Sequence, residues 1–170
     1  AVLDNMNKRY LTALAGKGLN VVPTTYLAAS ADLQLRTVLE GCGWNEVVLK
    51  PAVSASARGT WRTSLATANA DQIKFAAQVR TQDMLLQPYL PEIATKGEWS
   101  LMFFGGIYSH AVLKRPAVGD FRVQWQNCTA EEPDPALIEQ AQSILSVADG
   151  PLLYARVDGI ERAGQFVLME

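Results

Sequence analysis

Apolar residues recur along the first half of this chain at two spacings, one typical of helices and one typical of short strands. After Asp71, the residues Ile73, Ala76 and Val79 repeat at helical spacing, whereas 46–50 has the length of a strand and stops at a proline. The first half is therefore predicted to contain helices at 6–14, 33–39 and 71–79 and strands at 19–22, 46–50 and 84–87.

The second half is richer in strands, and glycine and proline mark its boundaries. Gly105–Gly106 separates two apolar runs, which is a strong signal for a hairpin with a two-residue turn. Asp134–Pro135 is a typical helix start, with a cap followed by the first turn, and an apolar stripe at helical spacing follows it. This half is therefore predicted to consist of strands at 98–104 and 107–113, a helix at 135–145 and a closing hairpin at 154–170.

The order of these elements predicts the fold class. It runs α-β-α-β-loop-α-β and then β-β-α-β-β, without a repeat or a low-complexity linker. We interpret this order as an α+β fold of two subdomains, 1–88 and 89–170, each built on a largely antiparallel sheet. A ligand is expected in the cleft that two such layers enclose.

Composition narrows the class of protein. The chain has 170 residues, 49% of them hydrophobic, and a formal net charge of −2, so we expect no binding to nucleic acid or membrane. Cys42 and Cys128 stand far apart, which favours two reduced thiols in a cytoplasmic protein over a disulfide. His110 is the only histidine, which excludes a zinc site built on histidines.

The closing hairpin carries the residues that most favour metal chemistry. If 162–164 is a three-residue loop, Asp158 lies opposite Leu168 and Arg156 lies opposite Glu170. Strand alternation then places Arg156, Asp158 and Glu170 on one face, where two carboxylates could bind a hard divalent cation. A two-residue loop would instead send Glu170 to the other face, and the alternative is a solvated hairpin with scattered charges.

Basic residues in the first half suit the phosphates of a nucleotide. Lys50 ends a strand and precedes a loop of small residues, in which Ser54 and Gly59 let backbone N–H groups approach phosphate oxygens. Lys8 is predicted to lie on the first turns of the first helix, where the helix dipole does not favour a cation. This position indicates that Lys8 serves a purpose other than stabilising the helix. The alternative is that both lysines are exposed and that the loop is an ordinary surface segment.

The segment that joins the two halves is interpreted as a hinge that binds adenine. Its backbone groups could read the edge of the base while apolar side chains enclose the ring. Glu92 or Glu98 could then accept hydrogen bonds from ribose hydroxyls. The alternative is a plain connector followed by surface charges. The hinge residues are Gln87, Pro88, Tyr89 and Leu90.

Charged residues also gather after the strand at 107–113. Lys114, Arg115 and Arg122 flank Asp120, and such cations suit the phosphate or carboxylate oxygens of a ligand. Lys114 follows the strand directly and is expected to point inward. The alternative is a solvated charged loop.

Together, these residues resemble the ATP-grasp superfamily over nearly the whole chain. The resemblance implies ATP and Mg²⁺ as cofactors, with Lys8, Lys50 and the following loop at the phosphates. It also implies that the hinge binds adenine and that Asp158 and Glu170 bind the metal. The matching segments are Asn7–Leu11, Gly18–Thr24, Val48–Pro51, Leu85–Leu90, Gly97–Ser100 and Arg156–Asp158 with Glu170.

Within that superfamily, 108–124 is most similar to the glutathione-synthetase-like group, which includes the ribosomal-protein glutamate ligases and the O-ureido-D-serine cyclo-ligases. The resemblance implies a ligase that joins a carboxylate to an amine through an acyl phosphate, acts on an amino acid or small peptide-like substrate, and could form a homodimer. Lys114, Arg122 and Arg156 would be catalytic. Two alternatives stay open, a nucleotide-binding fragment without turnover and an α+β interaction domain with coincidental motifs.

The sequence departs from the family pattern at several places. The loop 54–60 has fewer glycines than usual, and 126–129 stands where a glycine pair is expected. The resemblance also implies that a third metal ligand, two residues after Glu170, and the family's N-terminal substrate domain lie outside this chain.

Overall fold

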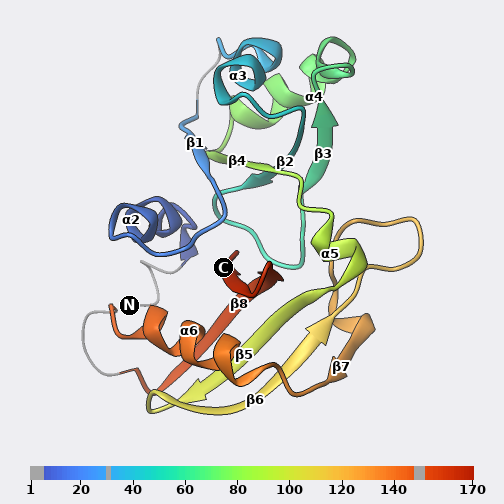
Figure 1. The fold of residues 1–170 in the computed structure, drawn as a ribbon. Coiled ribbons are helices and arrows are strands. Elements are labelled where there is room, and N and C mark those ends of the chain that lie inside the picture. The colour runs from blue at the N-terminus through green and yellow to red at the C-terminus, as the bar shows by residue number, and fades with distance from the viewer. Residues whose placement is uncertain (1–5, 30–31, 148–151) are drawn as a thin grey trace. The chain divides into compact units, whose positions relative to one another are not determined.

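The computed structural model describes residues 6–29, 32–147 and 152–170, and it divides into two compact units (Figure 1). Unit 1 comprises the residues up to Lys17 together with Val22–Tyr89. Unit 2 comprises Gly18–Val21 together with Leu90–Glu170. Each unit combines helices with its own antiparallel sheet, so the predicted α+β class is confirmed.

Unit 1 is a four-stranded sheet whose strands follow the order β1-β4-β2-β3. Leu39 of α3 and Phe75 of α4 are fully buried and pack with Leu49 of β2 and Leu86 of β4, so both helices cover one face of the sheet. The elements are α2 (Tyr10–Gly16), β1 (Thr25–Leu27), α3 (Leu35–Cys42), β2 (Glu46–Pro51), β3 (Trp61–Ser64), α4 (Ala68–Val79) and β4 (Met84–Pro88).

Unit 2 is a five-stranded sheet whose strands follow the order β7-β6-β5-β8-β9. Helix α6 lies along one face of it, where Leu137, Ala141 and Ile144 are buried (Figure 1). The predicted cap is present, because the Asp134 carboxylate accepts a hydrogen bond from Ala136 N–H at 2.8 Å. The elements are α5 (Glu92–Thr95), β5 (Glu98–Phe104), β6 (Ile107–Lys114), η1 (Trp125–Asn127), β7 (Cys128–Ala130), α6 (Pro135–Leu145), β8 (Tyr154–Arg162) and β9 (Gln165–Leu168).

The prediction of a strand at 19–22 is wrong, because this segment is used to extend the second sheet. Asn20 C=O accepts a hydrogen bond from Leu168 N–H at 2.9 Å, and its side-chain amide donates to Phe166 C=O at 2.9 Å. Only an isolated bridge links Val21 to Leu168, and the strand of unit 1 forms later, at Thr25–Leu27. Pro23 separates the two segments, since it has no N–H for a ladder.

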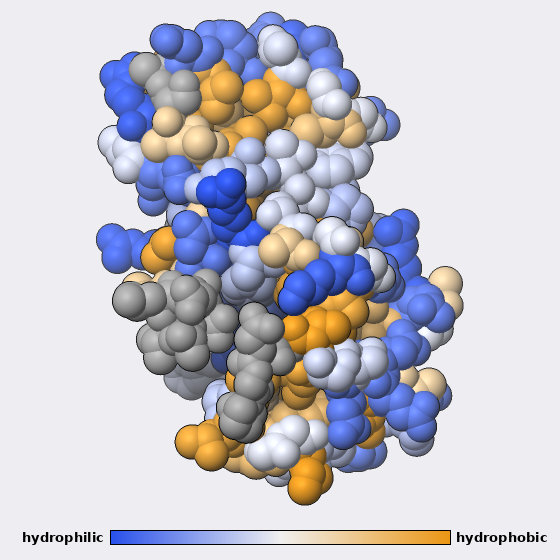
Figure 2. Space-filling view, turned by 90° about the vertical axis from the view of Figure 1, so that its left-hand side faces the viewer, coloured by the Kyte–Doolittle hydropathy of each residue, from blue (hydrophilic) through white to orange (hydrophobic). Residues whose placement is uncertain are grey.

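Large apolar side chains are exposed at the end of the second sheet that lies away from Glu98. Phe104 and Ile107 flank the β5–β6 turn, and Leu153 directly precedes Tyr154, the first residue of the neighbouring strand. The rings of Phe104 and Tyr154 are in contact, with centroids 5.4 Å apart. In Figure 2, hydrophobic residues (orange) are visible at the lower end of the view, interspersed with polar ones.

Helix α6 packs over β8 and β9, and Gly159 is the tightest position on that face. A Cβ atom at Gly159 would lie 2.5 Å from Cε1 and Cζ of the Phe166 ring and 2.6 Å from Val167 C=O. Phe166 is 1% exposed, so its ring cannot move aside without disturbing the core.

Gly159→Ala is therefore expected to lower the free energy of unfolding by about 1–3 kcal/mol, as overpacking of a core does. Gly41→Ala on α3 is the control, because no atom lies within 4 Å of its added Cβ and alanine favours a helix. Urea unfolding of both variants measures the difference. A Gly159→Ala protein as stable as the unchanged protein would contradict this packing.

Candidate functional site

Polar side chains line the face of the second sheet that is turned away from α6. Glu98 pairs with Lys114 across β5 and β6, and Ser100 pairs with Asp158 across β5 and β8. Because side chains alternate along a strand, these four share a face with Arg156, and the apolar residues between them point to α6.

Asp158 is the centre of this face. It is 3% exposed, yet both of its carboxylate oxygens have partners. Arg156 Nε lies 2.9 Å from Oδ1 and 3.0 Å from Oδ2, and Arg156 Nη2 lies 2.8 Å from Oδ2. The Ser100 hydroxyl donates to Oδ1, and Lys114 Nζ lies 3.4 Å from Oδ2. These contacts compensate a buried negative charge that would otherwise be costly.

Lys114 links Asp158 to Glu98. Its ammonium lies 2.9 Å from Glu98 Oε1, and both side chains are largely buried. Burial lowers the pKa of Lys114, but the neighbouring carboxylates of Glu98 and Asp158 raise it further, so the pKa lies above its usual range. Lys114 therefore remains a cation on this face at neutral pH.

The predicted register of the closing hairpin is wrong. The turn has two residues, since Arg162 pairs with Gln165 and Gly159, not Asp158, lies opposite Leu168. Ala163 adopts a positive φ of 51° beside Gly164 at 76°, which is the pattern of a type I′ turn. The prediction failed because it gave the left-handed conformation to glycine alone.

A β-bulge at the end of β9 nevertheless brings Glu170 opposite Asp158. Asp158 C=O accepts hydrogen bonds from both Met169 N–H, at 2.7 Å, and Glu170 N–H, at 3.1 Å. Asp158 N–H donates to Glu170 C=O at 2.8 Å, so these two residues form a directly opposed pair. Directly opposed residues share a face, which is the placement that the sequence predicted through a different register.

The donors of this pair suit Mg²⁺ better than a metal that needs a full protein cage. Mg²⁺ usually takes one or two carboxylates and completes its coordination with water and substrate phosphates. Across residues 6–29, 32–147 and 152–170, no group of three or more His, Cys, Asp or Glu side chains is arranged to hold a metal. Asp158 and Glu170 offer two hard carboxylates, so they fit a metal that arrives with phosphate ligands.

In unit 1, Lys8 sits against the small-residue loop. It lies in the turn before α2 and not within that helix, and it is 4% exposed. Its N–H donates to Ala52 C=O at 2.8 Å and its ammonium donates to Ser54 C=O at 2.6 Å. Lys50 lies on β2 next to buried Leu49, so alternation turns Lys50 away from the helices.

The loop itself is held in an unusual conformation. Ser56 and Ala57 have positive φ values of 53° and 55°, which cost non-glycine residues on the order of 1 kcal/mol each. Gly59 has φ of 74°, and a Cβ there would lie 2.9 Å from Pro51 Cγ. Two non-glycine residues of this loop thus adopt a conformation that glycine usually takes.

Part of the hinge is already hydrogen-bonded within unit 1. Tyr89 N–H donates to Glu46 C=O at 2.9 Å, and Pro88 has no N–H. The Gln87 side-chain amide donates to Thr24 at 2.9 Å. The Tyr89 ring is held beneath the Arg62 guanidinium, 4.1 Å from its centroid.

Three predicted site residues have other partners. Arg122 pairs with Asp120 at 2.9 Å and stays within its own loop, and Glu92 lies 3.0 Å from Arg162. Arg115 pairs with Glu131 at 2.7 Å, so the basic residues after β6 do not form one cluster. They neutralise nearby acids instead, and Lys114 is the one that faces Asp158.

Ser100 is the residue that the sequence interpretation missed. It is fully buried and its hydroxyl orients the Asp158 carboxylate. A small polar residue between Trp99 and Leu101 on an apolar strand is the signal that could have revealed it.

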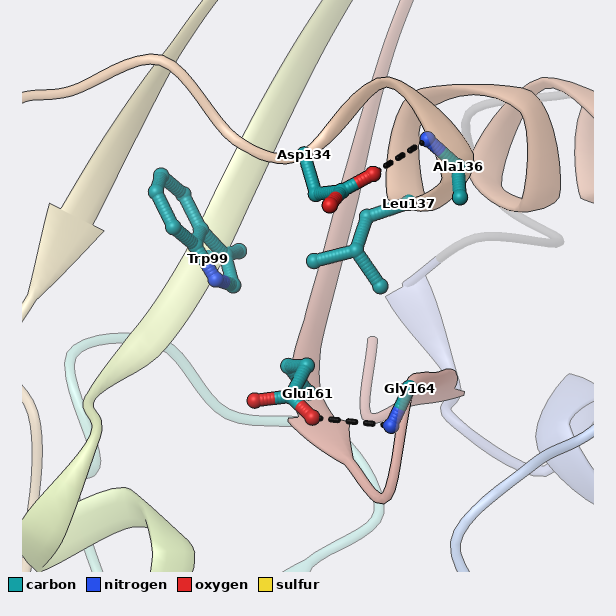
Figure 3. A pocket seen from close by; sticks show the side chains of 6 residues that line it. All are labelled: Trp99, Asp134, Ala136, Leu137, Glu161 and Gly164. Carbon is teal, nitrogen blue, oxygen red and sulfur yellow. Dashed lines mark hydrogen bonds between the residues drawn. The ribbon is translucent and has the colours of Figure 1, made fainter.

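A pocket of about 390 Å³ lies on the opposite, α6-covered side of the second sheet (Figure 3). Its carboxylates already have protein partners, because Asp134 caps α6 and Glu161 accepts a hydrogen bond from Gly164 N–H at 2.9 Å. The pocket lining therefore does not resemble the cluster of cations and carboxylates around Asp158. The lining residues are Trp99, Asp134, Ala136, Leu137, Glu161 and Gly164.

The chain thus folds as two α+β units, the first with a buried lysine at a tight small-residue loop and the second with an opposed carboxylate pair beside Lys114 and Arg156. Residues 11–155 match the sequence model described as "Prokaryotic glutathione synthetase, ATP-grasp domain". The chain belongs to this family, and the predicted resemblance is confirmed.

Known relatives agree with this assignment. The chain is 30% identical to the cycloserine biosynthesis protein DcsG of Streptomyces lavendulae, over 93% of this chain and 58% of that protein. The crystal structure of D-cycloserine synthetase DcsG superposes with a TM-score of 0.85 at 29% identity, over 97% of this chain and 61% of that one.

The structure of D-alanine–D-alanine ligase from Bacillus anthracis complexed with ATP is similar in fold, with a TM-score of 0.69 at 19% identity over 97% of this chain and 53% of that one. The chain thus spans between 53% and 61% of the length of these relatives.

No described helix is long and apolar enough to span a bilayer.

The pairing of Arg122 with Asp120 is open to a titration test. The hydrogen bond from the Arg122 side chain is the main reason that the pKa of Asp120 falls from 3.8 to about 2. The backbone N–H groups of Arg122 and Phe121 add to the effect. The stabilisation from this depressed pKa is present above pH 3.8 and is lost as the pH falls through about 2.

Arg122→Gln is expected to raise the pKa of Asp120 toward its ordinary value, without reaching it, because the backbone donors remain. Carboxyl ¹³C NMR titration measures the midpoint directly. Arg115→Gln is the matched control, since it removes an equal charge that contacts Glu131 instead. A midpoint that stays near 2 in Arg122→Gln would show that Arg122 is not the cause.

Proposed function

We propose that the protein is a magnesium- and ATP-dependent ligase that joins a carboxylate to an amine through an acyl phosphate. The observation that carries this proposal is the opposed pair of Asp158 and Glu170, with Arg156 and Lys114 on the same sheet face. Membership in the ATP-grasp family supports the assignment.

The nucleotide would use residues of both units, which would correspond to the subdomains 1–88 and 89–170. Adenine would lie at the hinge, Gln87–Leu90, with Leu90 rather than Tyr89 providing the backbone donor. Glu98 is a better candidate than Glu92 to accept hydrogen bonds from the ribose hydroxyls, because its ion pair with Lys114 keeps it on the same sheet face as Asp158. The phosphates would be bound by Lys8, Lys50 and the loop around Ser54 and Gly59.

Asp158 and Glu170 would hold the metal, and Ser100 would orient Asp158. Bound Mg²⁺ supplies positive charge to the triphosphate oxygens, which lowers the cost of moving negative charge during phosphoryl transfer. Lys114 would add a fixed cation beside the same oxygens.

In the reaction, an oxygen of the substrate carboxylate would attack the γ-phosphorus while the bond to the ADP oxygen breaks. The amine would then attack the acyl carbon, lose a proton to water, and expel phosphate that retains one oxygen of the original carboxylate. Arg156 is 45% exposed, so its remaining donors can stabilise the charge on the acyl phosphate. Arg122 would assist only by exchanging Asp120 for a substrate carboxylate.

The substrate class is proposed from size and chemistry. The 30% identity to a cycloserine biosynthesis protein supports an amino acid or small peptide-like molecule with a carboxylate, together with an amine acceptor.

Transfer of ¹⁸O tests the reaction directly. The protein is incubated with ATP, Mg²⁺ and mixed amino acids whose carboxylates carry ¹⁸O, and ADP and phosphate are analysed by mass spectrometry. We expect ADP to be released and one ¹⁸O atom to appear in each phosphate. ADP with unlabelled phosphate would contradict the acyl phosphate, and ATP binding without ADP release with any acceptor would favour a nucleotide-binding protein without turnover.

A further inference from the structure

A single helical turn separates the hinge from the proposed ribose acid. Leu90 C=O accepts a hydrogen bond from Ile93 N–H at 3.2 Å, and Glu92 C=O accepts one from Gly97 N–H at 3.1 Å. Helix α5 and its flanks therefore form a hydrogen-bonded spacer between Leu90 and Glu98. The length and direction of this spacer fix the distance between those two positions.

Two ion pairs tie this spacer to the end of β8. Glu92 Oε1 lies 3.0 Å from Arg162 Nε, and Lys96 Nζ lies 2.5 Å from Glu161 Oε2. Glu92 and Lys96 are four residues apart and share a helix face. Glu161 and Arg162 are consecutive, so their side chains point to opposite faces of β8. The two ion pairs therefore contact the end of this strand on both of its faces.

The far end of the spacer is fixed by close packing. Gly97 has φ of 93°, and a Cβ there would lie 2.8 Å from Lys114 C=O and 2.9 Å from Leu113 Cδ1. Only glycine fits this approach, so the chain enters β5 beside Lys114 at one position. The spacer is thus held by β6 at one end and by β8 along its length.

The energetics of these pairs favour a positioning role over a stabilising one. The side chains of Arg162 and Lys96 are 58% and 51% exposed, and ion pairs of that kind contribute about 0–1 kcal/mol. Glu92 Oε2 is buried and has no hydrogen-bond partner among the described residues, which costs stability. The contact of Glu92 with Arg162 is therefore better explained by the geometry it imposes than by stabilisation.

We propose that Glu92, Lys96, Glu161 and Arg162, here termed the α5 clasp, are positioning residues that hold Leu90, the unit 2 end of the hinge, in register with the metal pair of the same unit. The proposal rests on the proposed function. Asp158 lies three residues before Glu161 on the same strand, so a clasp at the strand end fixes where Asp158 and Glu170 stand relative to Leu90 and Glu98. A nucleotide whose adenine lies at Leu90 and whose phosphates bind the metal would therefore be sensitive to that spacing.

The test is the factor by which Mg²⁺ tightens binding of a non-hydrolysable ATP analogue, measured by calorimetry with and without Mg²⁺. Glu92→Gln and Arg162→Gln are each expected to reduce this factor on the order of tenfold, as loss of supporting contacts around a metal site does. The double variant should be no worse than either single variant, because both remove the same contact. Melting temperatures identify variants that fail to fold.

Glu131→Gln is the matched control, since it breaks an exposed ion pair of the same unit without touching α5 or the hairpin. An unchanged factor in both single variants, in a protein whose nucleotide binding does depend on Mg²⁺, would overturn the clasp and leave the proposed function standing. If nucleotide binding by the wild-type protein does not depend on Mg²⁺ at all, both the clasp and the proposed function are overturned. If the single variants unfold, Lys96→Gln takes their place, and an unchanged factor there overturns the clasp.

Discussion

A buried carboxylate on the sheet face turned away from α6 imposes the strongest constraint on this protein. Asp158 is nearly inaccessible to solvent, so its charge requires donors on both oxygens. Ser100, Lys114 and Arg156 supply them from three adjacent strands, which is possible only if β6, β5 and β8 keep their registers. The apolar face of the same strands packs against α6, so the core and the charged face depend on one alignment.

Local sequence patterns correctly predicted the structural features that depend on interactions between neighbouring residues. The Gly105–Gly106 turn, the Asp134 cap and the helix ending at Val79 depend on neighbouring residues, and all are present. The shorter elements β3, β7 and α5 were missed, because three or four residues carry too little periodicity to identify them. The use of 18–21 beside β9 also escaped prediction, since it depends on a partner about 150 residues away.

In the candidate site too, the features set by neighbouring residues were predicted and those set by distant residues were not. Arg156 and Asp158 share a face because they are two residues apart on a strand, which the sequence states directly. Glu170 reached that face through a two-residue turn and a bulge, two deviations that offset each other and that no pattern predicted. Ser100 became visible only from the register of β5 with β8, and the acids beside Arg115 and Arg122 had to be seen before those arginines could be separated from Lys114.

The proposed mechanism requires Asp158 and Glu170 to bind a divalent cation together with ATP. Electron paramagnetic resonance of Mn²⁺, used in place of Mg²⁺, measures this binding without requiring turnover. We predict that the unchanged protein binds Mn²⁺ tightly only when ATP is present and that Asp158→Asn loses this ATP-dependent binding while it remains folded. ATP-dependent Mn²⁺ binding that is the same in both proteins would contradict the account.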